Sequence, residues 1–374
     1  MIMNSVFDVI VVGGGVSGMS TAWKIGQTGR KVLLLEQGQL GKEASHAAAG
    51  MLGAQLEVAQ DGPFYRICVE SRELYPAFAE ELIEETRIDI GLSHNGILQL
   101  AQSDEEVESL QARARWQHEA GHATQWFSSD DVARLEPALA STRGALLLPK
   151  DGNVCAPALT QALEVAVYRR VNVMQGVQVH DILPRSHDVD VISSAGTFVG
   201  SQVVITAGAW AGRLIEAAGF SFPIYPVKGQ MLKIRPQQGL GIAHTVFSDH
   251  AYLVPKKDGS ILVGATEDHH AGFDKTVTAA AIYALLANLK RIAPQLATST
   301  FEQGWSGLRP GSPSGLPLLG PLPEARNVWL AAGHFRNGIL LAPVTAKMML
   351  AGLEGASGSE DWNTFLPERL TERY

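Results

Sequence analysis

Three glycines near the start of the chain have the spacing of a dinucleotide-binding loop. Gly13, Gly15 and Gly18 follow the apolar run 9–12, which predicts a buried parallel strand. The first glycine permits a tight turn, the second lets a pyrophosphate approach the backbone, and the third lets the next helix pack closely. That helix is expected to begin near Val16, where its unpaired N–H groups and positive dipole end would face the phosphates.

A carboxylate follows at the point where the ribose of such a cofactor needs one. A second predicted strand, residues 32–35, ends directly before Glu36. A carboxylate at the tip of this strand can accept hydrogen bonds from both hydroxyls of a ribose. The glycine spacing alone is weak evidence in a chain of 374 residues with 38 glycines. Because strand, helix, second strand and acid occur together, we predict a bound dinucleotide rather than an ordinary β-α-β unit.

Further predicted strands also end in small residues. Residues 201–206 run into Ala207-Gly208, and residues 328–331 run into a glycine before a helix expected from about residue 339. Ligands of open α/β sheets bind where such strand ends converge. The alanine-rich segment 44–52 either packs closely on a neighbouring element or lies against a flat ring system, and composition leaves both open.

These segments predict an α/β protein in which a Rossmann-type sheet is interrupted by an antiparallel domain. Residues 224–234 alternate apolar and polar side chains, and the apolar runs 251–255 and 261–265 flank an Asp-Gly turn typical of a hairpin. We predict that residues 1–88, 144–218 and 318–374 form the cofactor-binding domain. Residues 89–143 and 219–317 are expected to form a substrate-binding domain.

Composition narrows the class of protein and its compartment. The formal net charge of −8 argues against binding to nucleic acid, and no apolar run is long enough to span a membrane. Cys68 and Cys155 are far apart, as expected for a protein of the reducing cytoplasm without disulfides or a cysteine metal site. His269 and His270 have no third ligand at a suitable spacing, so we expect a surface loop and no metal.

The glycine loop, Glu36 and several internal segments together resemble one family. The segments are residues 47–54, 249–255, 305–311 and 333–343. They are similar to the flavin-dependent amine oxidases of the D-amino-acid oxidase and sarcosine oxidase family, and within it to the glycine oxidases. The resemblance runs from near residue 7 to about residue 353. It implies a Rossmann-type FAD-binding domain of the glutathione-reductase kind.

The resemblance also implies an activity. The family oxidises glycine or another small amine, such as sarcosine or a small D-amino acid, to an imine. The imine hydrolyses to glyoxylate and ammonia, and O2 reoxidises the flavin to give hydrogen peroxide. In glycine oxidases the imine feeds synthesis of the thiazole ring of thiamine, and the usual assembly is a homotetramer. Covalent flavin attachment through a cysteine is not expected, because residues 311–315 contain none.

The resemblance assigns residues to the cofactor site and to the substrate pocket. The expected pocket walls are Met51, His250 and Glu267, of which Glu267 departs from the methionine of the family's best-known member. A carboxylate there favours a cationic amine or a different amine substituent, or else points to solvent. The expected FAD-binding residues are Gly13, Gly15, Val16, Ser17, Gly18, Glu36, Gln37, Ser45, Ala48, Ala49, Gly50, Met51, Val177, Ala207, Gly208, Trp210, His334, Arg336, Asn337, Gly338, Ile339 and Leu340.

Substrate binding needs a group that recognises a carboxylate. Arginine suits this role because its planar fork donates two parallel charge-assisted hydrogen bonds. Arg309, at a strand end, matches the family's carboxylate-binding position; the alternative is a structural ion pair. Tyr252 is expected to donate its hydroxyl to the same carboxylate, or else to pack as a sheet aromatic. Arg336 is expected either to support the reduced ring or to help hold the substrate.

Three other functions also fit parts of this sequence. A D-amino-acid, sarcosine or D-proline oxidase, or a dehydrogenase of the same fold, would use the same residues. A flavin enzyme that modifies tRNA is disfavoured by the acidic charge. The third alternative is not an enzyme: it is a flavin-binding module without catalytic activity.

Overall fold

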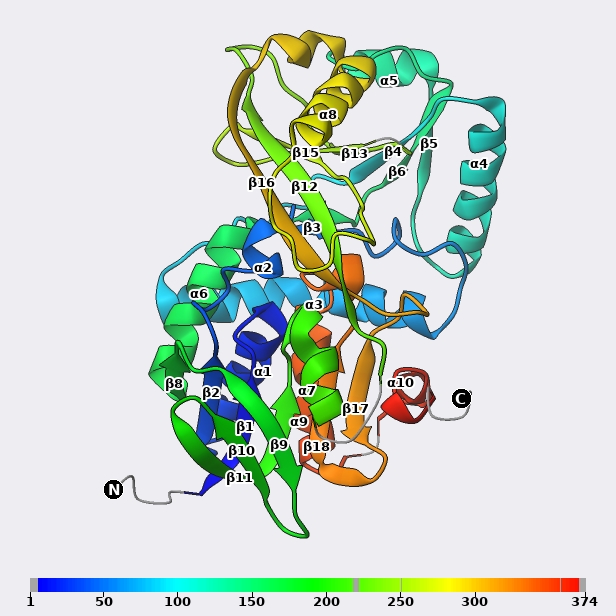
Figure 1. Cartoon of the computed structure of the whole chain (residues 1–374). Coiled ribbons are helices and arrows are strands. Elements are labelled where there is room, and N and C mark those ends of the chain that lie inside the picture. Colours follow the sequence, from blue (N-terminus) through cyan, green and yellow to red (C-terminus); the bar gives the residue numbers. More distant parts are fainter. Residues whose placement is uncertain (1–5, 218–221, 250, 357, 370–374) are drawn as a thin grey trace.

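The computed structural model describes residues 6–217, 222–249, 251–356 and 358–369, and the chain folds into two lobes (Figure 1). Each lobe is built on a sheet of eight strands among the described residues. The strands of the first sheet, in the lower lobe of Figure 1, are β1 (Phe7–Val12), β2 (Val32–Glu36), β8 (Asn172–Gln175), β9 (Val179–Pro184), β10 (Val189–Ser193), β11 (Gly196–Ile205), β17 (Leu318–Leu322) and β18 (Ala325–Ala332).

The centre of the first sheet is parallel. β1 pairs with β2 on one side and β11 on the other, and β8 and β18 extend the parallel run. Side chains of β1 alternate between two cores: Val9 and Val11 join one cluster, and Ile10 and Val12 join the other. Strands buried on both faces read as continuous apolar runs, which explains the sequence pattern. The predicted α/β class is confirmed.

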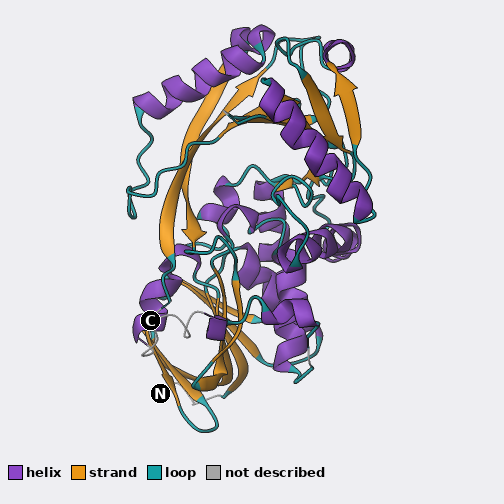
Figure 2. Cartoon of the chain, turned by 90° about the vertical axis from the view of Figure 1, so that its right-hand side faces the viewer, coloured by secondary structure: helices purple, strands orange, loops and turns teal. Residues whose placement is uncertain are grey.

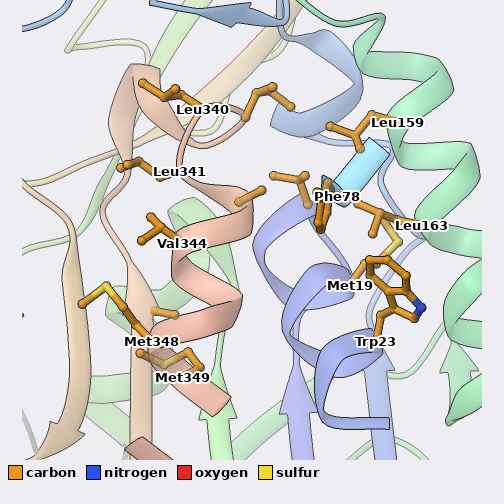
Figure 3. Close-up of a cluster of buried hydrophobic side chains, with 14 of the residues drawn as sticks. Met19, Trp23, Phe78, Leu159, Leu163, Leu340, Leu341, Val344, Met348 and Met349 are labelled. Carbon is orange, nitrogen blue, oxygen red and sulfur yellow. The ribbon is translucent and has the colours of Figure 1, made fainter. Parts of the chain in front are cut away.

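Helices cover one face of this sheet. They are α1 (Val16–Gln27), α3 (Pro63–Thr86), α6 (Ala156–Arg170) and α9 (Ala342–Leu353). Figure 3 shows their apolar side chains meeting in one cluster, including Trp23 from α1, Phe78 from α3 and Leu163 from α6. The opposite face packs on β9, β10 and α7 (Ala211–Ala217). This packing holds the amino end of α1 above the end of β1.

The second sheet forms the upper lobe. Its strands are β4 (Ile97–Ala101), β5 (Gln125–Ser128), β6 (Gly144–Leu148), β12 (Tyr225–Arg235), β13 (Thr245–Phe247), β14 (Tyr252–Pro255), β15 (Ile261–Gly264) and β16 (Thr300–Gly311). All pairs are antiparallel except β4 with β13. Helices α4 (Asp104–Glu119), α5 (Ser129–Leu135) and α8 (Ala279–Ile292) flank it, as Figure 2 shows from the side.

Three details differ from the sequence expectations. Residues 144–148 were expected in the first lobe, but as β6 they pair with β4 and β5 of the second sheet. The late helix begins at Ala342 rather than near 339, because a 3-10 turn, η3 (Phe335–Asn337), precedes it. β12 is buried over residues 227–232 rather than half exposed, because β15 and β16 flank it and α8 packs on it. The division into a cofactor-binding and a substrate-binding domain stays a prediction.

The two lobes are joined where β14 ends. The ammonium of Lys256 donates to the carbonyl of Ala49 (2.7 Å), the side-chain oxygen of Asn153 (2.8 Å) and the carbonyl of Val154 (2.9 Å). Gly50 lies in the left-handed region with φ 79°, and a Cβ there would stand 2.1 Å from the carbonyl oxygen of Val154. The segment of small residues before β3 (Met51–Leu52) is thereby fastened to both lobes.

We expect Lys256→Met to destabilise the protein strongly. Burial lowers the pKa of Lys256 to about 7, but three acceptors require the three N–H groups that only the ammonium has. Removing it leaves those buried acceptors unpaired, so the free energy of unfolding should fall by about 3 kcal/mol or more. Denaturant unfolding of the purified protein measures this loss.

Lys257→Met is the matched control. Lys257 is exposed, and among the described residues its one ion-pair partner is the exposed Asp89 (3.0 Å). Exposed ion pairs contribute roughly 0–1 kcal/mol, so this variant should stay near the wild type. Equal losses in the two variants would contradict the role assigned to Lys256.

Candidate functional site

Two neighbouring cavities lie over the carboxyl ends of the parallel strands. The larger, of about 370 Å³, lies between the lobes, and the smaller, of about 160 Å³, extends along the first sheet. They adjoin, since five residues line both. These shared residues are Gly15, Ala44, Ser45, Thr206 and Gly208. Together they form an elongated channel at the place where open α/β sheets bind ligands.

The three glycines of the loop have three different environments. Gly13 has φ 112°, and a Cβ there would stand 2.6 Å from the carbonyl oxygen of Thr206. A Cβ at Gly18 would stand 1.9 Å from the carbonyl oxygen of Gly13, so α1 packs closely on the turn. Gly15 is different: a Cβ there would meet only the Ser45 hydroxyl, at 3.4 Å, and the residue lines both cavities. The tight turn at Gly13, the close packing at Gly18 and the open backbone at Gly15 are the three features that the glycine spacing predicts.

The carboxylate of Glu36 is held in place by the backbone. It accepts hydrogen bonds from the N–H of Gly14 (2.6 Å) and from the N–H of Gly38 (2.7 Å), one on each oxygen. Glu36 is buried and lines the smaller cavity. Each oxygen keeps a second lone pair, so the group can accept two further hydrogen bonds from a diol.

The amino end of α1 opens onto the channel. The N–H of Val16 donates to the hydroxyl of Ser45 (2.9 Å), which lies in the short helix α2 (Ala44–Ala47). Val16, Ser17 and Ser45 all line the larger cavity. Backbone N–H groups with the helix dipole behind them favour an anion here.

Arg309 places a guanidinium in the larger cavity. It extends from β16 across Gly229 of β12, where a Cβ would stand 2.3 Å from its Nη1 atom. Nη1 donates to the carbonyl of Thr266 (3.1 Å), and Arg309 forms no ion pair with any described carboxylate. Its remaining donors are therefore available to an anionic ligand.

Tyr252 lies beside Arg309. Its ring covers Gly264, where a Cβ would stand 2.5 Å from the ring, and its hydroxyl lies 3.5 Å from the sulfur of Met231. Burial raises the pKa of Tyr252, and the neighbouring Arg309 partly opposes this. The phenol stays protonated at neutral pH and can donate to the ligand that Arg309 binds.

Arg336 has a different electrostatic environment. Its Nε atom lies 3.4 Å from Oε2 of Glu57, and its Nη1 atom lies 4.0 Å from Oε2 of Glu267. Burial raises the pKa of Glu57, while Arg336 and then Arg309 favour its ionised form. Nearby His334 is neutral, because burial lowers its pKa to about 4. Arg336 is thus paired with carboxylates, whereas Arg309 is not.

Most residues predicted for the site line the channel. Gly18 and Leu340 do not: Gly18 packs under the turn, and the Leu340 carbonyl accepts from Ser71 (2.6 Å) in the core. His250 lies outside the described residues. The larger cavity is lined by the predicted Gly15, Val16, Ser17, Ser45, Ala48, Ala49, Gly50, Met51, Gly208, Tyr252, Glu267, Arg309, His334, Arg336, Asn337, Gly338 and Ile339. The smaller is lined by the predicted Gly13, Gly15, Glu36, Gln37, Ser45, Val177, Ala207, Gly208 and Trp210.

Sequence reasoning missed several lining residues. The most consequential is Glu57, which follows the turn after β3 and has no motif around it. The others in the larger cavity include Thr206, Gly229, Met231, Phe247, Asp249, Gly307 and Phe335. Of these, Gly229, Met231, Phe247 and Gly307 are on strands, and the side of the sheet that they face depends on tertiary packing.

Comparisons with known proteins agree with this geometry. A family model described as "FAD dependent oxidoreductase" (DAO) matches residues 8–351. A glycine oxidase of Geobacillus kaustophilus is 39% identical over 92% of this chain and 92% of its own length. The crystal structure of glycine oxidase from that organism has a TM-score of 0.93 at 38% identity, covering 96% of this chain and 98% of that one.

A third relative is longer than this chain. The bifunctional protein ThiO/ThiG of Trichormus variabilis is 33% identical over 91% of this chain, which corresponds to 52% of that protein.

Among the described residues, no helix combines the length and apolar character needed to cross a bilayer. Within the same residues, no three histidine, cysteine or acidic side chains gather as a metal site would require. From its channel and from the match over nearly its whole length, the chain belongs to the DAO family of FAD-dependent oxidoreductases.

Proposed function

We propose that the protein oxidises glycine, and other small amines with a carboxylate, to the imine. The observation that carries this proposal is the Arg309 guanidinium, which faces the larger cavity beside Tyr252 without a carboxylate partner among the described residues. The glycine oxidase relatives support the choice of glycine.

The channel fits FAD by its donors and by its small residues. Glu36 would bind the ribose, and the N–H groups at the start of α1 would bind the pyrophosphate. Gly15 leaves the backbone open to the phosphates, and the small residues 47–50 would lie along the ring. Non-covalent binding fits the described cysteines, since neither Cys68 nor Cys155 lines either cavity.

The reaction requires mainly that the protein holds the substrate in the correct orientation. Bound FAD would supply a two-electron oxidant for the substrate carbon, with O2 as the final acceptor and hydrogen peroxide as its product. Arg309 and Tyr252 would bind the substrate carboxylate and so orient its α-carbon. The second lobe covers the larger cavity and limits the access of water. Once the imine leaves, it hydrolyses to glyoxylate and ammonia.

Alternatives with the same chemistry differ in their substrate or electron acceptor. Anaerobic bleaching of the flavin by glycine, sarcosine, D-alanine and D-proline would rank the amines. Oxygen uptake would separate an oxidase from a dehydrogenase. Supply of the imine for the thiamine thiazole, a homotetrameric assembly and a cytoplasmic location follow from the family resemblance and stay predictions.

Arg309→Lys should reduce kcat/KM for glycine by about 100-fold or more, because loss of about 3 kcal/mol of bidentate pairing corresponds to that factor. Lysine keeps the charge but lacks the planar fork, so FAD content should not change. Steady-state oxygen uptake and flavin absorbance measure the two quantities. Arg235→Lys is the control, since Arg235 is on β12 but pairs with Glu302 at the surface. Turnover that survives in Arg309→Lys would assign the carboxylate to another group.

Glu36→Ala should weaken FAD retention by about 10-fold or more through loss of two hydrogen bonds to the ribose, at about 1–1.5 kcal/mol each. The ranking of amine substrates should stay the same. The flavin-to-protein ratio after dialysis is the measurement. Glu36→Gln, which keeps the shape and one acceptor, should retain more FAD than Glu36→Ala. Because Glu36 also binds the Gly14 and Gly38 amides, the unfolding of the apoproteins is compared as well. An unchanged ratio in Glu36→Ala would contradict the ribose role.

A further inference from the structure

A cluster of charged groups lies at one side of the larger cavity. It consists of Glu57, Arg336 and Glu267, which we call the acidic mouth. The side chain of Glu57 is 10% exposed, whereas those of Glu267 and Arg336 are 39% and 48% exposed. The cluster therefore extends from the cavity interior to solvent. Glu267 also contacts His269, with 2.9 Å between Oε1 and the ring Nε2 atom.

The charges that line this cavity are not balanced. Its described lining residues include two arginines, Arg309 and Arg336, and three acids, Glu57, Asp249 and Glu267. Both measured contacts of Arg336 with acids fall within the acidic mouth. Arg309 contacts the carbonyl of Thr266 instead. Among the described residues, the Arg309 guanidinium thus has no carboxylate partner and can bind an anion, whereas Arg336 already contacts two acids.

We infer that Glu57 and Glu267 determine substrate specificity by restricting the cavity to amino acids with a single carboxylate. They occupy Arg336, so that Arg309 alone binds an anion, and their charge repels a second carboxylate on the substrate. This inference rests on the proposed function. The substrate class it names is glycine and amines with neutral substituents, as opposed to aspartate-like or N-carboxymethyl compounds.

Electrostatics supports exclusion at this position. Like charges brought together in a partly desolvated site disfavour the wrong ligand, and such repulsion is a common source of specificity. The effective dielectric constant of a cavity is well below that of water, so a nearby carboxylate is felt strongly. Glutamine at either position keeps the shape and removes the charge.

A pair of non-reacting ligands tests the inference. Malonate and its monoamide, malonamate, are similar in size and differ in one carboxylate. We expect the FAD-loaded protein to bind malonamate at least 30-fold more tightly than malonate, as measured by titration of the flavin absorbance. In Glu57→Gln/Glu267→Gln this ratio should fall to about 3-fold or less, and in Glu267→Gln it should be intermediate. Glu70→Gln, which removes a charge that pairs with Lys347 away from the cavity, should leave the ratio unchanged.

Several results would overturn the inference. Equal binding of the two ligands by the wild type would do so, as would an unaltered ratio in the double variant. If Glu57→Gln fails to fold, Glu267→Gln decides alone, because the Glu267 side chain is partly exposed and its substitution leaves the contact between Glu57 and Arg336 intact. A ratio equal to that of the wild type then counts against the inference.

The titration requires no turnover, so it tests the charge selection independently of glycine oxidation. A ratio that changes as expected, in a protein that does not oxidise glycine, would reject the proposed function and keep the charge selection. If neither ligand perturbs the flavin spectrum, both fail. Turnover of D-asparagine against D-aspartate repeats the comparison with neutral and charged isosteres, and the preference for D-asparagine should shrink in the double variant.

Discussion

The structure depends on the contact that fastens the small-residue segment before β3 between the lobes. Lys256 reaches from the second sheet to the carbonyls of Ala49 and Val154, and Gly50 lets the chain pass against Val154. Residues 48–51 line the larger cavity, while Tyr252 is on the strand that Lys256 follows. Lys256 therefore connects the wall of the cavity formed by residues 48–51 to the strand of the second sheet that carries Tyr252.

Charge is distributed unevenly within that cavity, and the two arginines illustrate it. Both line the cavity, but only Arg336 has carboxylates within ion-pairing distance among the described residues. The sequence predicted Arg309 as the carboxylate-binding residue, but it did not show that carboxylates lie beside Arg336 and not beside Arg309. Their difference comes from Glu57, a residue that follows an irregular turn and becomes a neighbour only through the fold. The two arginines therefore differ in their contacts because different groups pack around them.

Local patterns predicted the first sheet well. The loop glycines, Glu36 and the apolar runs of β1 and β2 depend on neighbours in sequence, so their structure could be read directly. Lys256 was not foreseen as a buried residue, because Lys-Lys before Asp-Gly is typical of an exposed hairpin tip. Likewise, the apolar run 144–148 fits a buried strand of either sheet, so its pairing as β6 with β4 and β5 was not visible from those residues. The start of α9 was misplaced because Phe335, with φ 48°, begins a 3-10 turn that no periodicity marks.

The order of the strands along the chain has a consequence for synthesis on the ribosome. In the first sheet β1 and β2 come early, but β11, which pairs with β1, and β18, which pairs with β11, follow only after segments that belong to the second sheet. The emerging chain thus makes the glycine loop long before the strand that supports it, and β18 ends only at Ala332. Pairings between such distant segments close large loops and are slow. The lining of the larger cavity extends from Gly15 to Ile339, so its full set of residues exists only after translation has passed β18.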